Sequence, residues 1–282
     1  MDRSIAIAGG GTMGVGIAYA FVISGWKTTV VEPSPGRRSA LLERVESLAR
    51  DGVSRGKIGE AALPDRLRNL NVVECVEQVP TGLDLIIESV PESLDLKLSV
   101  LAELESRHPL VLASNTSSFS VDVLASALAR PERFLGMHFF NPVWSLGLVE
   151  VIRGRATAQD CLDAATTAVS EIGKEVAIIN DAPGFASSRL DLVYALEAIR
   201  MVEEGVGAPR DIDRVVTLAY RHPIGPLRLS DVVGLDVRLD TARSLAASLG
   251  PRFEPPDLLV RMVAEGSLGE KSGCGFYDWT AR

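Results

Sequence analysis

The fold is decided by the stretch Ile5-Ala6-Ile7-Ala8-Gly9-Gly10-Gly11-Thr12-Met13-Gly14 near the start of the chain. The apolar run predicts a buried strand, and the residues after Gly14 predict a helix. Gly9, Gly11 and Gly14 fill the spacing G-x-G-x-x-G, which permits a tight turn, close approach to a pyrophosphate, and close packing of helix on strand. The stretch therefore predicts a dinucleotide site, in which backbone N–H groups at the helix start (Thr12 and Met13) face the anion.

Apolar runs alternate with helical stretches beyond this turn. The further runs are Thr28–Glu32, Asn71–Val73, Leu83–Glu88, Leu110–Ser114, Phe134–Phe139, Leu148–Ile152 and Val176–Ile179, and the main helical stretches are Met13–Ser24, Arg37–Arg50, Leu94–Ser106 and Gln159–Ile172. Parallel strands buried on both faces give continuous apolar runs of this kind. The pattern predicts an α/β fold: a Rossmann-type, doubly wound, mostly parallel sheet with helices on both faces.

The pattern changes at Asp181-Ala182-Pro183-Gly184, after which helical segments dominate. These segments are Ser187–Glu203, Asp211–Tyr220, Asp236–Leu249 and Leu258–Glu265. We therefore expect an NAD-binding Rossmann domain over residues 1–182 and an all-helical domain over residues 183–282.

The composition narrows the class of partner. The chain has 282 residues, of which 46% are hydrophobic and 23% charged, a composition typical of a globular protein. Its net charge is −8, whereas binding to a phosphate backbone needs basic patches. We therefore expect a small-molecule substrate rather than nucleic acid. No apolar run of about 18 residues occurs, so no membrane span is expected. The three cysteines show neither metal-ligand spacing nor a disulfide pattern, which predicts no metal and a cytoplasmic location.

Glu32 indicates which dinucleotide binds. It ends the second apolar run, where a carboxylate can accept hydrogen bonds from both ribose hydroxyls and would repel a 2′-phosphate. This favours NAD over NADP, although the guanidinium groups of Arg37 and Arg38 could attract that phosphate.

His138 is the candidate acid–base residue among three histidines. His108 and His222 lie beside prolines in predicted loops, whereas His138 ends a predicted strand of the sheet. The carboxyl edge of such a sheet is where ligands bind. Glu150, within an apolar run, is a candidate to orient the imidazole, although alone it also fits an edge strand facing solvent.

The polar cluster Ser114-Asn115-Thr116-Ser117-Ser118 follows another predicted strand. It is well placed to hydrogen-bond the substrate or the nicotinamide ribose. It also fits the cap of a helix beginning near Ser120, and different members of the cluster can serve both purposes.

Together these motifs resemble the L-3-hydroxyacyl-CoA dehydrogenase family, which includes 3-hydroxybutyryl-CoA dehydrogenase and L-gulonate 3-dehydrogenase. The resemblance rests on Gly9–Gly16, Ser114–Ser118, His138-Phe139-Phe140-Asn141-Pro142, Leu148–Ile152, Pro183-Gly184-Phe185, His222–Pro226, Gly234-Leu235-Asp236 and Lys271–Tyr277. It covers essentially the full length and implies NAD-dependent oxidation of a 3-hydroxyacyl-CoA, or the reverse reduction, by a homodimer formed through the helical domain.

The resemblance also implies residue roles. His138 corresponds to the catalytic base, Glu150 to its orienting carboxylate, and Ser117 to the serine that hydrogen-bonds the reacting oxygen. The resemblance makes Glu92 and Lys97 cofactor contacts, and Asn115 and Asn141 further polar groups of the site.

Two departures from the family keep other substrates open. Ser188 stands at the position where the family's catalytic centre usually has Asn, and Trp144 lies in an altered segment, Pro142–Gly147. A hydroxyl is shorter than an amide and lacks its paired donor and acceptor. The alternatives are a related dehydrogenase acting on a free hydroxy acid, a sugar acid or a carrier-protein-bound hydroxyacyl group, and a non-catalytic dinucleotide-binding protein. Arg55 and Lys57 are candidate contacts for a CoA ligand, and they fit a solvated loop equally well.

Overall fold

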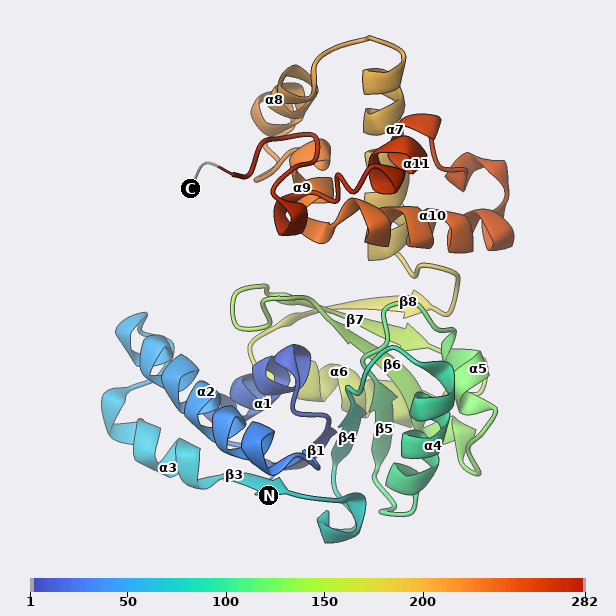
Figure 1. The fold of residues 1–282 in the computed structure, drawn as a ribbon. Helices are drawn as coiled ribbons and strands as arrows, with labels where there is room; N and C mark the ends of the chain where they lie inside the picture. The colour runs from blue at the N-terminus through green and yellow to red at the C-terminus, as the bar shows by residue number, and fades with distance from the viewer. Residues whose placement is uncertain (1–2, 281–282) are drawn as a thin grey trace. The chain divides into compact units, whose positions relative to one another are not determined.

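The computed structural model describes residues 3–280 and divides into two compact units between Ala182 and Pro183 (Figure 1). The first unit contains an eight-stranded sheet of order β3-β2-β1-β4-β5-β6-β7-β8. The strands are β1 Ser4–Ala8, β2 Lys27–Val31, β3 Leu70–Val73, β4 Leu85–Glu88, β5 Val111–Ser114, β6 Phe134–Phe139, β7 Leu148–Arg153 and β8 Glu175–Asn180. All neighbours are parallel except β6 and β7, which run antiparallel.

Helices cover both faces of this sheet (Figure 1). They are α1 Thr12–Ser24, α2 Pro35–Ser54, α3 Leu63–Arg68, α4 Leu94–Glu105, α5 Val121–Ala125 and α6 Gln159–Glu171, with short 3₁₀ turns at Glu60–Ala62, Val76–Gln78 and Pro131–Arg133. Helices α4 and α5 pack on β4 and β6, respectively, whereas α1 and α6 join one continuous apolar core on the other face. The predicted mostly parallel sheet with helices on both faces is confirmed.

Alternation along the strands divides the sheet into an apolar face and a face with polar ends. Successive side chains point to opposite faces, so Ile5 and Ile7 enter the core with α1 and α6, as do Leu85 and Ile87 of β4. The side chain of Glu88, the last residue of β4, points to the opposite face. Glu88 pairs in register with Ser114 of β5. A buried carboxylate and hydroxyl therefore lie side by side at the carboxyl edge, on the face covered by α4 and α5.

The antiparallel pair β6–β7 fixes the position of two predicted residues. His138 of β6 lies directly opposite Glu150 of β7 in the register. Residues directly opposite across an antiparallel pair project to the same face, with Cβ atoms roughly 4.5–5.5 Å apart. Because Gly136 is in register with Ser114, this is also the face that carries Glu88.

The second unit is helical. It contains α7 Ser187–Glu203, α8 Pro209–Ala219, α9 Pro226–Val233, α10 Leu235–Leu249 and α11 Asp257–Ala264, with 3₁₀ turns at Pro251–Phe253 and Glu270–Ser272. Its core includes Leu192, Leu196, Leu227, Leu239 and Phe253, all buried. Within residues 183–280, β-pairing is confined to isolated bridges at Cys274, as the helical prediction requires.

Two short helices, α3 and α9, were missed by the periodicity. Helix α9 begins in a proline-rich connection, and its first N–H groups are capped from another helix: Asp213 of α8 accepts hydrogen bonds from the backbone N–H groups of Leu227 and Arg228, each at 2.9 Å. This capping across the fold leaves no signal in the local sequence.

Candidate active site

The glycine turn connects β1 to α1 at the carboxyl edge of the sheet. Gly9 has φ of +109°, in the region that favours glycine, and a Cβ there would lie 2.5 Å from the carbonyl oxygen of Ser89. A Cβ on Gly14 would lie 1.8 Å from the carbonyl oxygen of Gly9. A Cβ on Gly11 would meet no heavy atom within 4 Å. Gly9 and Gly14 are thus required by the turn itself, while Gly11 borders open space that suits a pyrophosphate.

Glu32 lies directly after β2 and beside this turn. Its Oε2 accepts a hydrogen bond from the N–H of Gly10 at 3.2 Å, and its Oε1 accepts one from the N–H of Ser34 at 2.9 Å. Arg37 Nε lies 3.2 Å from Oε1, and Arg38 donates to the Glu32 carbonyl oxygen at 2.9 Å. Both arginines are therefore engaged by Glu32 itself, and the buried carboxylate lies beside the glycine turn.

A cleft of about 800 Å³ lies along this edge of the first unit. Most of the predicted site residues line it: Gly9, Gly11, Thr12, Met13, Glu32, Glu92, Asn115, Ser117, His138 and Asn141. The volume is within the roughly 300–1,000 Å³ of small-molecule and cofactor sites. The cleft therefore joins the glycine turn to the predicted acid–base residue within one unit.

His138 and Glu150 form a hydrogen-bonded pair at this cleft. His138 Nδ1 lies 2.9 Å from Glu150 Oε2, and the two residues are 8% and 2% exposed. The ring of Phe140 packs against the imidazole with centroids 4.7 Å apart. A carboxylate at Nδ1 favours the tautomer that carries its proton on that nitrogen, which directs the basic lone pair to Nε2. This arrangement can accept a proton and stabilise the resulting imidazolium.

The loop after β5 is tied to the end of β6. Asn115 Oδ1 accepts a hydrogen bond from the N–H of Phe139, the residue after His138, at 2.9 Å. Ser117 is exposed at the cleft, and its N–H donates to Glu92 Oε1 at 3.1 Å. Ser120 caps α5 by accepting from the N–H of Val123 at 3.3 Å. The helix is thus capped by Ser120, outside the cluster Ser114–Ser118, whereas Asn115 and Ser117 of the cluster line the cleft.

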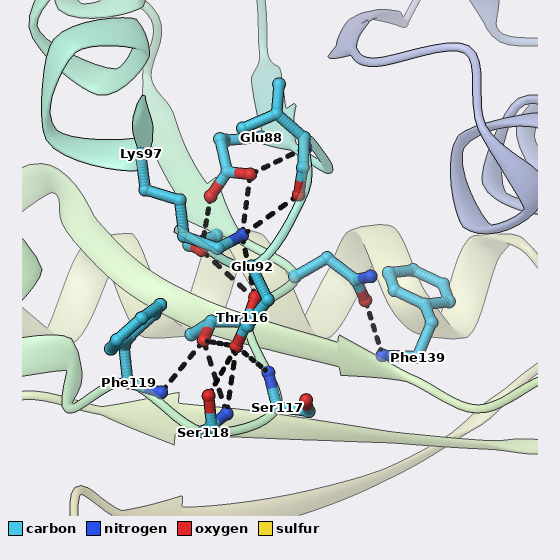
Figure 2. A network of polar contacts seen from close by, with 11 residues as sticks. Glu88, Glu92, Lys97, Thr116, Ser117, Ser118, Phe119 and Phe139 are labelled. Atoms are coloured by element: carbon cyan, nitrogen blue, oxygen red, sulfur yellow. Dashed lines mark hydrogen bonds and ion pairs between the residues drawn. The ribbon is translucent and has the colours of Figure 1, made fainter. Parts of the chain in front are cut away.

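Glu92 and Lys97 belong to one polar network (Figure 2). Lys97 Nζ lies 3.1 Å from Glu92 Oε2 and 2.8 Å from Glu88 Oε1, and the lysine side chain is only 1% exposed. Burial alone would raise the pKa of Glu92, but hydrogen bonds from Thr116 and Ser118 and the charge of Lys97 outweigh it, so the pKa is lowered. Glu92 faces the cleft as a carboxylate, whereas the ammonium of Lys97 lies in the network rather than in the cleft lining.

The remaining predicted residues lie outside the cleft lining. Gly14 packs under the turn, and Glu150 is buried beside His138. Ser188 is the second residue of α7, in the other unit. Its role stays a prediction.

The altered segment around Trp144 is anchored by two lysines. Lys57 Nζ donates to the carbonyl oxygen of Trp144 at 2.6 Å, and Lys174 Nζ donates to those of Val143 and Leu146 at 2.6 and 2.5 Å. The guanidinium of Arg44 lies over the Trp144 ring, 5.8 Å from its centroid. Lys57, considered above as a contact for CoA, is thus already bonded within the chain.

Sequence reasoning missed Glu88, whose side chain is fully buried and which joins Lys97 to Ser114. An acidic residue at the end of an apolar run, nine positions before a lysine, was the available signal.

Among residues 3–280, no group of three or more His, Cys, Asp or Glu side chains is arranged to hold a metal ion. Over the same residues, no helix has the length and apolar character needed to cross a membrane.

Comparison with known proteins matches both units of the chain to one family. Residues 4–182 match the family model for the 3-hydroxyacyl-CoA dehydrogenase NAD binding domain, and residues 184–279 match the model for the C-terminal domain of the same family. A probable 3-hydroxybutyryl-CoA dehydrogenase from Bacillus subtilis is 38% identical over 281 residues, covering 98% of this chain and 97% of the relative. A 3-hydroxybutyryl-CoA dehydrogenase from Mycobacterium tuberculosis is 40% identical over 286 aligned residues, covering 98% of each chain.

A solved structure leads to the same family. The crystal structure of (S)-3-hydroxybutyryl-CoA dehydrogenase from Ralstonia eutropha has a TM-score of 0.94 and 34% sequence identity, and the match covers 99% of this chain and 100% of that one. The chain therefore belongs to the 3-hydroxyacyl-CoA dehydrogenase family, whose members are NAD-dependent oxidoreductases.

Proposed function

We propose that this protein oxidises a 3-hydroxyacyl-CoA to the 3-oxoacyl-CoA with NAD, or catalyses the reverse reduction, with His138 as general base and acid. The observation that carries the assignment is the His138–Glu150 pair, joined at 2.9 Å beside the cleft of the glycine turn. The names of the relatives make 3-hydroxybutyryl-CoA the first substrate to assay.

The residues of the cleft fit NAD. Gly11 leaves open space beside the N-terminus of α1, and the buried Glu32 carboxylate stands at the end of β2. We assign the pyrophosphate to the turn Gly9–Gly14 and the adenosine ribose to Glu32. NAD, when bound, supplies the acceptor for the hydride that leaves the carbinol carbon.

The proton moves through the chain's own residues. His138 Nε2 takes the proton of the substrate hydroxyl, and Glu150 stabilises the imidazolium that results. The Ser117 hydroxyl donates a hydrogen bond to the same substrate oxygen and steadies it as its charge develops. In the reverse direction His138 Nε2 returns the proton to the carbonyl oxygen. Asn115 and Asn141 are proposed as further polar contacts of the cleft, and Ser188 is proposed as a substrate contact.

A second substrate class is supported by the altered segment. Trp144 is held by Lys57 and Arg44, and Ser188 replaces the amide expected from the family. A free hydroxy acid, a sugar acid or a carrier-protein-bound hydroxyacyl group is therefore the alternative substrate. Comparing turnover of acetoacetyl-CoA with turnover of free hydroxy and sugar acids, followed by NADH absorbance, separates these substrates.

His138→Gln tests the central assignment. General acid–base catalysis contributes about 10²–10⁴-fold, so turnover of acetoacetyl-CoA should fall by that factor while NADH still binds. The matched control is His108→Asn, which alters an exposed histidine with φ of 53° that asparagine tolerates. Its turnover should equal that of the parent protein. Full turnover in His138→Gln would remove His138 from its proposed role. If the parent protein binds NADH but turns over no hydroxylated substrate, the result would favour a non-catalytic protein.

We also propose a homodimer formed through the helical unit. Apolar side chains remain exposed on and beside α7 and α8: Leu190 and Leu218 are each 68% exposed, and Val215 is 57% exposed. Val215 also lines one groove with Val206 and Tyr220, which are 62% and 66% exposed, and a contiguous exposed apolar patch is typical of an interaction surface. Light scattering should give twice the chain mass, and Leu218→Asp should shift the protein toward the monomer. A parent protein that is monomeric at micromolar concentration would refute this proposal.

A cytoplasmic location is proposed from the cysteines, all three of which are free in the structure. Fractionation of cells that produce the protein tests this location.

A further inference from the structure

Glu88 is a fully buried carboxylate at the end of β4, outside the cleft lining. Its Oε1 accepts hydrogen bonds from Lys97 Nζ at 2.8 Å and from the N–H of Val90 at 2.7 Å. Its Oε2 accepts one from Ser114 Oγ at 2.6 Å. Burying a carboxylate is costly unless charge and hydrogen bonds compensate it, and Glu88 has both. The group is therefore held in one orientation.

Lys97 carries this constraint to Glu92. The lysine projects from α4, and its ammonium lies between Glu88 Oε1 at 2.8 Å and Glu92 Oε2 at 3.1 Å (Figure 2). It also donates to the carbonyl oxygen of Val90 at 3.3 Å. With Oε2 tied to Lys97, the other oxygen of Glu92 is directed at the loop after β5.

Glu92 Oε1 accepts several hydrogen bonds from that loop (Figure 2). It accepts from Thr116 Oγ1 at 2.5 Å, from the N–H groups of Ser117 and Ser118 at 3.1 Å each, and from Ser118 Oγ at 2.8 Å. A second route runs from Glu88 through Ser114, whose Oγ accepts from the N–H of Thr116 at 3.2 Å. Glu88 thus reaches this loop by two paths, one ending at the N–H of Ser117 and the other at the N–H of Thr116.

We propose that Glu88 is a positioning residue for the reaction: by fixing Lys97 and Ser114, it holds Glu92 and the Ser117 backbone, and so sets where the Ser117 hydroxyl stands in the cleft. The inference rests on the proposed function, in which Ser117 contacts the reacting oxygen. A misplacement of about 1 Å at a reacting group can cost on the order of 10²-fold in rate. Glu88 therefore acts on turnover although it does not line the cleft.

The test is Glu88→Gln, which keeps the shape of the side chain but removes its charge. At temperatures at which the variant is folded, kcat should fall about 10- to 100-fold, since the loop can shift by a fraction of the distance considered above. The control is Asp84→Asn, which removes a carboxylate just before the same strand. Asp84 is hydrogen-bonded to Arg3 and Ser4, beyond the end of β4 opposite to Glu88. Its kcat should stay within about 2-fold of the parent value, as for changes outside the site.

A double-mutant cycle distinguishes positioning from a structural role. If Glu88 acts through Ser117, Glu88→Gln added to Ser117→Ala should change kcat less than about 3-fold, because the group that it positions is gone. Hydrogen exchange at the amides of Ser117 and Ser118 should accelerate in Glu88→Gln, while exchange in β2 and β3 is unchanged.

Unchanged kcat in Glu88→Gln would overturn the inference, as would an equal loss in Asp84→Asn or a full additional loss in the Ser117→Ala background. If Glu88→Gln does not fold, Glu88→Asp, which keeps the charge but withdraws it by one methylene, is measured against the same outcomes. His138→Gln separates the two levels of failure. If His138→Gln lowers turnover by about 10²–10⁴-fold while Glu88→Gln leaves kcat unchanged, only the positioning role is lost, whereas full turnover in His138→Gln removes the proposed function.

Discussion

Gly11→Ala and Gly14→Ala should fail for different physical reasons, although both alter the same turn. At Gly14 the new Cβ would lie 1.8 Å from the carbonyl oxygen of Gly9, a backbone atom that no change of side-chain conformation can move away. Overpacking of this kind costs about 1–3 kcal/mol or more. For a unit of this size, about 3 kcal/mol corresponds to a fall in Tm of roughly 6–12 °C.

At Gly11 the fold should survive and the ligand should not bind well. The residue has φ of −73° and ψ of −171°, which any residue adopts, and its Cβ would meet no heavy atom within 4 Å. Tm should therefore be unchanged. The methyl group would occupy space assigned to the pyrophosphate and cost at least one charge-assisted hydrogen bond, about 1.5–3 kcal/mol. This loss weakens NADH binding roughly 10- to 150-fold.

Thermal unfolding and NADH fluorescence titration measure the two effects separately. The control is Gly59→Ala, at a position with φ of −71° and open space, away from the cleft lining. It should change neither Tm nor the Kd for NADH. Parent-like NADH affinity in Gly11→Ala would show that the pyrophosphate does not lie on this turn. A parent-like Tm in Gly14→Ala would refute the close packing of turn on helix.

Three further predictions concern buried or partly buried groups. Glu150→Gln should lower kcat by about 10²–10⁴-fold, because the imidazolium of His138 loses its carboxylate, while the Kd for NADH is retained. Steady-state kinetics measures this change, and an unchanged kcat would exclude the pair from catalysis. Burial raises the pKa of the Cys161 thiol to about 12, so a thiol reagent should modify Cys75 and Cys274 in the native protein and Cys161 only after denaturation. Fast modification of all three would contradict the buried position of Cys161. The folded-state pKa of Glu92 is lowered, so its ionised form stabilises the fold above the unfolded pKa of about 4.3, and this contribution is lost as pH falls through the lower folded value. The Tm difference between the parent and Glu92→Gln should therefore be constant near neutral pH and shrink below about pH 4; a difference that grows in acid would reverse this sign.

Local sequence was sufficient for much of the fold. The glycine spacing and the apolar runs depend on neighbours a few positions apart, so the strand–turn–helix at Gly9–Gly14 and the change of pattern near Ala182 could both be read from the chain. His138 could be selected because only three histidines occur and one of them ends an apolar run. The same reasoning proposed Glu150 as its partner but left open an edge strand facing solvent.

The tertiary structure decided which side chains meet. Antiparallel pairing of β6 with β7 places Glu150 opposite His138, whereas a slip of one residue in register would send Glu150 to the other face of the sheet. Lys97, predicted as a cofactor contact, lies between the carboxylates of Glu88 and Glu92. Such contacts join strands and helices far apart in the chain, and their geometry follows from register and packing, which no local pattern of residues encodes.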